Sequence, residues 1–455
     1  MTDAWLERAT ALSEMKDWQG LLDCCRDWTK NEPQNSIAWK NLGDVYLALN
    51  RDKDAINAYR EALRINPEDD DASGSLGWLY TRLKRYGDAI EIYRQRLQIK
   101  PEHDYDWDRL GWLYEELGYF DDVIGVYRQR LQIKPEDNDA RNKLGRLYDK
   151  LDRCDDAIET YREALRINPE DDEAWSMLGD VYERLDQHDD ALEAYHEALR
   201  INPENDSAWS CLGDVYERLD QHDDALEVYR QRLQIKPEDD LAWYKLGNVY
   251  ERLNQHDDAI KALREALRID PEDNHAWYKL GDVYERLDQH DDAIEAYREA
   301  LRIYPDFDIV WHSLGNVYER LGQDDDAIKA YREALRINPD FAIAWNSLGI
   351  AYKYIDHYDD AIEAYRQAIH IKPKDAGFWT SLGDIYHDLD RHKDAIKAYR
   401  KVVSIDPENA DVWYLLGAEY NLSGNKTAAM DAFRQLKHLD PEQADDLFNL
   451  IVPNY

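Results

Sequence analysis

The chain has 455 residues, of which 96 are acidic and 57 are basic, so its formal net charge is −39. Apolar residues make up 44% and aromatic residues 12%, which is too many for a disordered acidic chain. The negative charge argues against sequence-independent binding to nucleic acid or to an anionic membrane face, because both require a cationic surface.

The first residues, MTDAWLERAT, contain neither a basic segment nor an apolar segment, so no signal peptide is expected. No run of about 18 apolar residues occurs, which predicts no membrane insertion. Cys24, Cys25, Cys154 and Cys211 form no CxxC pair and no disulfide framework. This cysteine usage fits a reducing compartment and predicts a cytoplasmic protein.

Thirteen of the 14 prolines recur every 34 residues, from Pro33 to Pro441, without an insertion. A strict period of this length predicts a solenoid of stacked units instead of several globular domains. The first unit, residues 2–35, keeps Trp5 and Pro33 but lacks a Leu-Gly pair found in the others. Terminal units are often atypical because one of their faces meets water. Twelve regular units follow in residues 36–443.

Residues 274–307 illustrate one unit. A first helix is predicted from apolar residues three or four positions apart, Trp277, Leu280, Gly281 and Tyr284. A second helix is predicted from Ala293, Tyr297 and Ala300. Pro305 prevents this second helix from continuing. Each unit is therefore expected to be a helical hairpin, in which the small residues Gly281 and Ala293 let the two helices approach closely.

The pattern W-x2-LG-x2-Y, then A-x3-Y-x2-A, then P, resembles the tetratricopeptide repeat over residues 2–443. The resemblance implies an all-α fold, a right-handed superhelical α-solenoid of antiparallel helix pairs. It also implies that the first helix of each pair lines a concave groove that binds peptides or proteins. The family's clamp for a C-terminal carboxylate is not matched, since Lys40 is followed by Asp44 and Ser75. Arg96, Arg130 and Arg232 replace a small residue of the pattern, which predicts looser helix junctions.

The sequence contains none of the common catalytic motifs, neither GxxxxGK, GxSxG, HExxH nor EF-hand spacing. We therefore expect no enzyme activity and no cofactor. The string QHDD recurs at His188, His222, His256 and His290, and His with Asp can bind Zn or Ni. The simpler interpretation is that the His packs in the turn while the two aspartates favour the start of the second helix, through capping and the helix dipole.

The resemblance places positions 2, 5, 9, 12 and 13 of each unit in the groove. In the middle units, Asp or Asn, Glu and Arg recur at positions 9, 12 and 13, which predicts a ladder of ion pairs between units, each contributing about 0.2–1 kcal/mol. Trp78 and Trp112 interrupt this pattern at position 9 of adjacent units, and residues 138–150 form the only strongly basic helix. The candidate partner-binding residues are Trp78, Tyr105, Arg109, Trp112, Asn142, Arg146 and Lys150.

Structural explanations exist for the same residues. Trp78 stands in a unit that lacks the signature Trp at Ser73, and Arg146 and Lys150 could only neutralise neighbouring acids. A second, weaker candidate stretch has side chains suited to hydrogen bonding with a peptide backbone. Its residues are Tyr244, Asn248, Tyr278, His312, Asn316 and Asn346.

The sequence therefore predicts a non-enzymatic scaffold that holds a protein or peptide partner in its groove. The alternative is a structural element that assembles end to end or side by side, since the middle units are nearly identical. Residues 444–455 are apolar at Leu447, Phe448, Leu450, Ile451 and Val452. They are expected to form a closing helix over the last unit, or else a surface for self-association.

Overall fold

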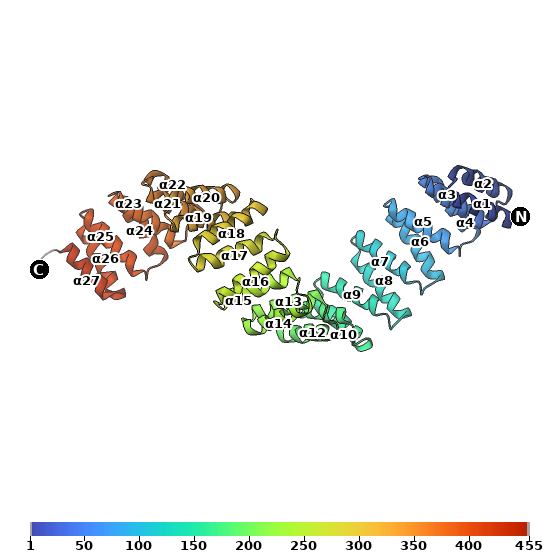
Figure 1. Ribbon diagram of the computed structural model, residues 1–455, viewed down its shortest axis with the longest axis horizontal. Coiled ribbons are helices and arrows are strands. Elements are labelled where there is room, and N and C mark those ends of the chain that lie inside the picture. The colour runs from blue at the N-terminus through green and yellow to red at the C-terminus, as the bar shows by residue number, and fades with distance from the viewer. Residues whose placement is uncertain (1, 453–455) are drawn as a thin grey trace. The chain divides into compact units, whose positions relative to one another are not determined.

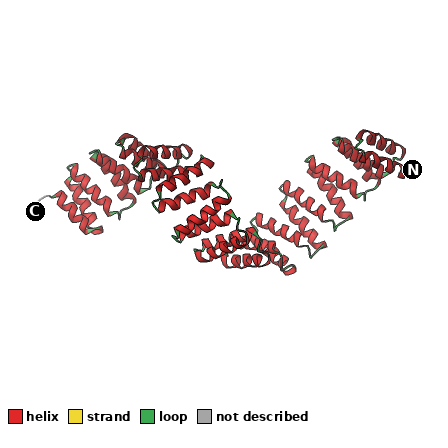
Figure 2. Cartoon of the chain, viewed as in Figure 1, coloured by secondary structure: helices red, strands yellow, loops and turns green. Residues whose placement is uncertain are grey.

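The computed structural model describes residues 2–452, and these contain 27 α-helices and no strand (Figure 2). The predicted all-α fold is therefore confirmed. The predicted tail at residues 453–455 lies outside the described residues. None of the helices in the described part of the chain combines the length and the apolar character needed to cross a membrane.

The chain divides into two compact units, Met1–Val215 and Tyr216–Tyr455, with the boundary inside α13 (Asp206–Arg218). The first unit contains α1 (Thr2–Glu14), α2 (Trp18–Asn31), α3 (Ser36–Ala48), α4 (Asp52–Ile65), α5 (Asp70–Arg82), α6 (Tyr86–Ile99), α7 (Asp104–Glu116), α8 (Phe120–Ile133), α9 (Asn138–Lys150), α10 (Cys154–Ile167), α11 (Asp172–Arg184) and α12 (His188–Ile201). The second contains α14 (His222–Ile235), α15 (Asp240–Arg252), α16 (His256–Ile269), α17 (Asn274–Arg286), α18 (His290–Ile303), α19 (Asp308–Arg320), α20 (Asp324–Ile337), α21 (Ala342–Tyr354), α22 (Tyr358–Ile371), α23 (Ala376–Asp388), α24 (His392–Ile405), α25 (Ala410–Leu422), α26 (Lys426–Leu439) and α27 (Pro441–Ile451).

Within residues 2–452, the helices from α1 to α26 form thirteen pairs, one for each 34-residue repeat (Figure 1). The odd-numbered member of each pair, here named helix A, has 13 residues, and the even-numbered member, helix B, has 14. The two run antiparallel because only three residues join them, as between α17 and α18. The predicted solenoid of antiparallel helix pairs is confirmed.

Caps and turns fix the bounds of each pair. Asp273 precedes α17 and its side chain accepts hydrogen bonds from the backbone N–H groups of His275 and Ala276. The turn that follows helix A contains a residue with positive φ, such as Asp288 at 54°, which ends the helix. Helix B receives no side-chain cap at Gln289, so the aspartates that follow favour its N-terminus through the helix dipole alone.

The repeated Trp and Pro are joined by a hydrogen bond. In ten repeats of the described chain, the indole N–H donates to the carbonyl oxygen of the proline six residues earlier, at 2.7–3.0 Å. Trp277 and Pro271 are one such pair. Because proline ends helix B of one repeat and Trp begins the packing of the next helix A, this bond ties the connection between repeats to its following helix.

The repeated Gly and Tyr explain how closely the two helices of a pair approach. A methyl group added at Gly281 would lie 2.5 Å from Cε1 of the fully buried Tyr297, so no larger residue fits there. At Gly77 and Gly111, in the first two repeats that carry the buried Arg variant, the distance is 3.0 Å to Cζ of Tyr93 and 2.9 Å to the hydroxyl of Tyr127. The Gly–Tyr contact is therefore less close in these two pairs than at Gly281.

Helix α27 covers the last helix pair. It begins at Pro441, three residues before the predicted start at 444, and Asp440 caps it. Leu447 and Ile451 are buried, and Leu447 packs against Gly417 of α25. On the outer side of α27, Phe448 and Leu450 remain 37% and 43% exposed.

Candidate protein-binding site

Most residues at position 9 of helix A have a structural partner. The hydroxyl of the buried Tyr297 donates to Asp282 at 2.8 Å, and that of Tyr331 donates to Asn316 at the same distance. Burial raises the pKa of Asp282 to about 6 despite this hydrogen bond. The acids and amides at this position therefore serve first to satisfy a tyrosine in the core of each pair.

The predicted ion-pair ladder is also present and occupies much of the same surface. Arg252 lies 3.7 Å from Glu217, and Arg286 lies 3.0 Å from Glu251 of the preceding repeat. Arg184 pairs with Asp149 in the same way. These regular repeats therefore place their charged groups in contacts between neighbouring helices.

Trp78 and Trp112 replace the position 9 acceptor and leave a different surface. Their side chains are 41% and 37% exposed. The buried Tyr93 hydroxyl, which faces the place of the missing acceptor in its pair, has no hydrogen-bond partner within the described residues. Since an unpaired buried hydroxyl costs about 1–3 kcal/mol, a tryptophan at this position is unfavourable for folding alone.

Arg109 on α7 connects the exposed rings. Its guanidinium lies 5.8 Å from the centroid of Tyr105 and 5.1 Å from that of Trp112, distances at which cation–π attraction operates. Tyr105 is 53% exposed. Arg109 makes no ion pair in residues 2–452, and its buried Nε atom lacks a hydrogen-bond partner there. We name Trp78, Tyr105, Arg109 and Trp112 the aromatic face.

The other three predicted residues are engaged elsewhere. Asn142 donates to Asp171 at 3.1 Å, Arg146 pairs with Glu173, and Lys150 lies 2.7 Å from Glu115. Thus the structure joins Tyr105, Arg109 and Trp112 in one cluster, while the cations of α9 are neutralised by acids of adjacent helices.

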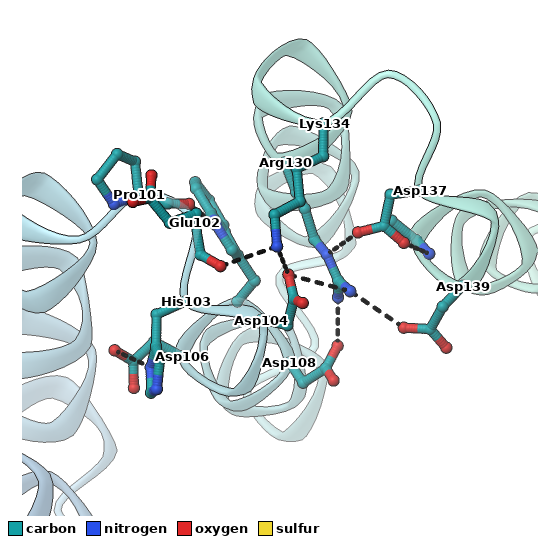
Figure 3. A network of polar contacts seen from close by, with 12 residues as sticks. Pro101, Glu102, His103, Asp104, Asp106, Asp108, Arg130, Lys134, Asp137 and Asp139 are labelled. Carbon is teal, nitrogen blue, oxygen red and sulfur yellow. Dashed lines mark hydrogen bonds and ion pairs between the residues drawn. The ribbon is translucent and has the colours of Figure 1, made fainter.

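Two buried arginines hold the N-terminal half of α7, the helix that carries this cluster. Arg96 from α6 lies 2.9 Å from the buried carboxylate of Asp106. Arg130 from α8 is 3% exposed and contacts Asp108 and Asp137 at 2.8 Å and 2.7 Å, as Figure 3 shows. These arginines are the variants noted in the sequence, and they fix α7 between its two neighbours.

The charges around Arg130 are extensive. Asp104 and Asp139 also lie within 4 Å of its guanidinium, and Lys134 bonds Asp104 at 2.7 Å (Figure 3). The hydrogen bond from Lys134, together with Arg130, holds the pKa of Asp104 below its usual range. Arg130 therefore shares the carboxylates at the start of α7 and α9 with Lys134 and with Lys143, which lies 2.7 Å from Asp108.

The second predicted stretch, in the unit that begins at Tyr216, contains aromatic contacts that the sequence analysis missed. Phe307 lies 5.6 Å from Tyr278, and Phe341 lies 5.1 Å from His312, as ring centroids. Both phenylalanines occupy the N-cap position of a helix A and make no cap hydrogen bond. Losing such a cap costs about 1 kcal/mol. The signal was readable, because other repeats carry Asp or Asn at this position.

The remaining predicted residues of this stretch take mixed roles. Tyr244 packs against the core of the unit. Asn316 accepts from Tyr331, whereas the buried Oδ1 atoms of Asn248 and Asn346 have no hydrogen-bond partner among the described residues. Leu241, Ile309 and Ile343 are 44–49% exposed at position 2 of their repeats. This stretch is accordingly more apolar than the sequence indicated.

His312 should make folding of this unit pH-dependent. Burial lowers its pKa to about 4, below the ordinary value of about 6.5, so the imidazole is neutral when folded at pH 7. The contribution of the neutral imidazole to the free energy of unfolding is fully present above pH 6.5. It is lost as the pH falls toward 4, because His312 takes up a proton at a higher pH in the unfolded chain than in the folded one. Between pH 7 and 5, the free energy of unfolding should fall by about 1–2 kcal/mol more than in His312→Asn. Denaturant titrations at both pH values measure this free energy. The prediction would be contradicted if it changed equally between pH 7 and 5 in the two proteins.

The QHDD turns do not assemble ligands for a metal ion. Among residues 2–452, no group of three or more His, Cys, Asp or Glu side chains is placed to hold one. The Nδ1 atoms of His188, His222, His256 and His290 are buried without a hydrogen-bond partner in this part of the chain. Each of these histidines is the first residue of its helix B, directly after the turn in which the sequence analysis placed it.

The paired helices, the Gly–Tyr contact and the recurring Trp and Pro define a helical repeat solenoid of the tetratricopeptide class. Models of this repeat match residues 26–70, 41–104, 107–141 and 150–186. A model of the C-terminal domain of cilia and flagella-associated protein 70 matches residues 169–281 and 275–447. The chain belongs to the tetratricopeptide repeat family, whose fold is that of a protein-interaction scaffold.

Solved structures with similar folds include three repeat proteins. The crystal structure of MamA is 29% identical and covers 36% of this chain and 95% of its own, with a TM-score of 0.35. YrrB, described as a TPR protein with an unusual peptide-binding site, is 24% identical and covers 40% and 94%, with a TM-score of 0.36. The Cut9-Hcn1 hetero-tetramer is 16% identical and covers 99% and 96%, with a TM-score of 0.40. A search of curated proteins finds no match.

Proposed function

We propose that this protein is a non-enzymatic cytoplasmic scaffold that binds an extended protein segment on the aromatic face formed by α5 and α7. One observation carries the proposal. Arg109 lies over two exposed rings without an ion pair among the described residues, although the chain carries a net charge of −39. Free cysteines at all four positions support the reducing compartment.

The partner segment fits this chemistry if it offers an apolar or aromatic anchor beside a carboxylate. The anchor packs against Trp78 and Trp112, whose indoles supply large apolar contacts at little cost in conformational entropy. The carboxylate pairs with the guanidinium of Arg109, which is already oriented by the rings of Tyr105 and Trp112. The unpaired hydroxyl of Tyr93 lies close enough to Arg109 for the cation to lower its pKa, against the dominant effect of burial.

A displayed library of random peptides, selected on the purified full chain, tests the proposal. We expect enrichment of an aromatic residue next to Asp or Glu. The affinity of a synthetic peptide from that selection should fall at least about tenfold in Trp112→Ala and in Arg109→Met. Tyr354→Ala is the matched control, because this exposed tyrosine lies in the other compact unit. Selection of the same sequences on Trp112→Ala would contradict the proposal.

Self-association is a second candidate function, and it rests on α27. Phe448 and Leu450 are exposed, and so are Leu422 at the end of α25 and Leu439 at the end of α26, which are 52% and 39% exposed. Apolar groups on the outer side of a closing helix support contact with a second copy. Light scattering of the purified protein over a concentration range tests this, and a constant monomeric mass would exclude it over that range.

The second predicted stretch extends the binding proposal to the unit that begins at Tyr216. This stretch has four half-buried rings that form two contacting pairs, Tyr278 with Phe307 and His312 with Phe341. We expect it to bind apolar side chains of a protein partner, since two helix caps are given up for these rings.

A further inference from the structure

A pocket lies on the helix B side of the first unit, between α6 and α8, away from the aromatic face. Its volume is about 640 Å³. Trp107 and Tyr114 of α7 line its apolar part together with Leu97 and Leu110. The indole N–H of Trp107 is already bonded to Pro101, so the ring itself is fixed in place.

Two other repeats have a smaller pocket at the corresponding residues. One, lined by Arg162, Trp175 and Tyr182, has a volume of about 380 Å³. The other, lined by Arg264, Trp277 and Tyr284, has a volume of about 330 Å³. Each position is shifted by a whole number of 34-residue repeats from the first pocket, so the three can be compared residue by residue.

Gly125 accounts for the larger opening. The corresponding residues in the two smaller pockets are Glu193 and Glu295. A methyl group placed at Gly125 would meet no atom within 4 Å, unlike one at Gly111 in the same repeat, which would meet Tyr127 at 2.9 Å. A glycine inside a helix costs about 1 kcal/mol relative to alanine. Close packing of helices therefore gives no reason for Gly125.

The pocket has also lost charged side chains that its counterparts carry. Gln98 stands where the other two pockets have Arg166 and Arg268. Gln129 and Gln132 stand where the repeat with the pocket of about 380 Å³ has Glu197 and Arg200, which pair with each other at 2.9 Å. Three primary amides thus replace an ion-paired rim, and each amide offers both a donor and an acceptor.

The arginine of the pocket is less engaged than in the other repeats. Arg162 and Arg264 donate to the hydroxyls of Tyr182 and Tyr284 at 2.6 Å. Arg94 lies over the ring of Tyr114 at 5.5 Å and makes no ion pair in the described chain. Asp121 and Asp122 line the same pocket, so its lining contains both positively and negatively charged side chains.

We infer that this pocket binds an uncharged segment of a partner protein. The segment's backbone amides bond to Gln98, Gln129 and Gln132, and one neutral side chain fills the space above Trp107 that a glutamate occupies elsewhere. A charged side chain placed among Gln98, Gln129 and Gln132 would lose hydration without meeting an opposite charge on these amides, so a neutral side chain is favoured. This site is distinct from the proposed aromatic face, because none of its lining side chains belongs to that face, although α7 contributes residues to both.

Fluorine NMR of the full chain labelled with 5-fluorotryptophan tests the inference. The resonance of Trp107 is assigned by its loss in Trp107→Phe, and the other indoles serve as internal references. The probes are three capped tetrapeptides, acetyl-Ala-X-Tyr-Ala-amide, in which X is Gln, Lys or Glu, and the disaccharide maltose. We expect the Gln peptide to shift the Trp107 resonance on titration, with an affinity at least about tenfold higher than that of the Lys or Glu peptide.

The variant Gly125→Glu separates binding from folding. It restores the residue of the equivalent pockets, so the thermal midpoint should stay the same or rise, while affinity for the Gln peptide falls about tenfold or more. Gly87→Glu is the matched control, because Gly87, near the start of α6 in the preceding helix pair, also has open space around it and does not line the pocket. The inference is overturned if the charged peptides bind equally well, if maltose alone binds, if no probe shifts Trp107, or if Gly125→Glu binds like the unmodified chain.

Discussion

Replacing His387 and His392 together with alanine should lower the free energy of unfolding by roughly 3–5 kcal/mol, because it leaves a buried carboxylate without its partners. Glu419 on α25 is 1% exposed. Its two oxygens contact Nδ1 of His387 at 2.5 Å and Nδ1 of His392 at 3.0 Å. Other repeats have a fully buried Val at this position, such as Val283 and Val317.

The repeat pattern provides the control for this prediction. Glu419→Val, added to the double alanine variant, should restore most of the lost free energy, since it removes the unpaired charge and supplies the usual apolar side chain. Denaturant unfolding followed by hydrogen exchange in α23 to α27 measures the effect where it arises. A double alanine variant that unfolds like the unmodified protein would show that water or other groups satisfy Glu419.

Arg130→Ala should cost about 3 kcal/mol even though alanine is the usual residue at this position, as at Ala164 and Ala198. The change removes the cation that the nearly buried Asp137 pairs with, whereas Asp108 keeps its ion pair with Lys143 at 2.7 Å. Added salt should recover part of the loss, because it screens the repulsion between the half-exposed acids.

The control for this change is Arg128→Ala on the same helix. Arg128 is exposed and lies 6.0 Å over the ring of Tyr148, so its loss should change stability by no more than about 0.5 kcal/mol. Thermal denaturation of both variants gives the comparison. Equal midpoints would contradict the prediction and would mean that Lys134 and Lys143 suffice as counter-charges for the aspartates near Arg130.

The helix pairs could be predicted because their signals are local and occur thirteen times. The spacing of Trp, Gly and Tyr and the recurring proline suffice to predict two helices in each repeat. The start of α27 was less certain, because Pro441 belongs both to the repeat pattern and to the first turn of the closing helix. The hydrogen bond between Trp and Pro was not foreseen, although both residues were noted.

The candidate site was harder to predict, because charge pairing depends on residues in neighbouring repeats. Trp78 and Trp112 were recognisable as departures from the position 9 pattern. Arg146 was a plausible cation for a ligand, yet it pairs with Glu173, which lies in the next repeat. That Arg109 makes no ion pair among the described residues could be learned only from the structure, because it depends on the positions of all the surrounding side chains. Gly125 departs visibly from the Glu found at the same position of other repeats. The pocket beside it could not be predicted, because three helices form it.

The bond between each tryptophan and the proline six residues before it also bears on how the chain folds. It closes within a short segment, so forming it requires almost no loss of entropy from loop closure. The other cross-repeat hydrogen bonds, such as that between Lys150 and Glu115, span about one repeat in sequence. Contacts this near in sequence give a low contact order, for which fast folding is expected despite the length of the chain. A nascent chain is therefore expected to form the connection between two repeats as soon as its proline and the tryptophan of the next helix A have left the ribosome.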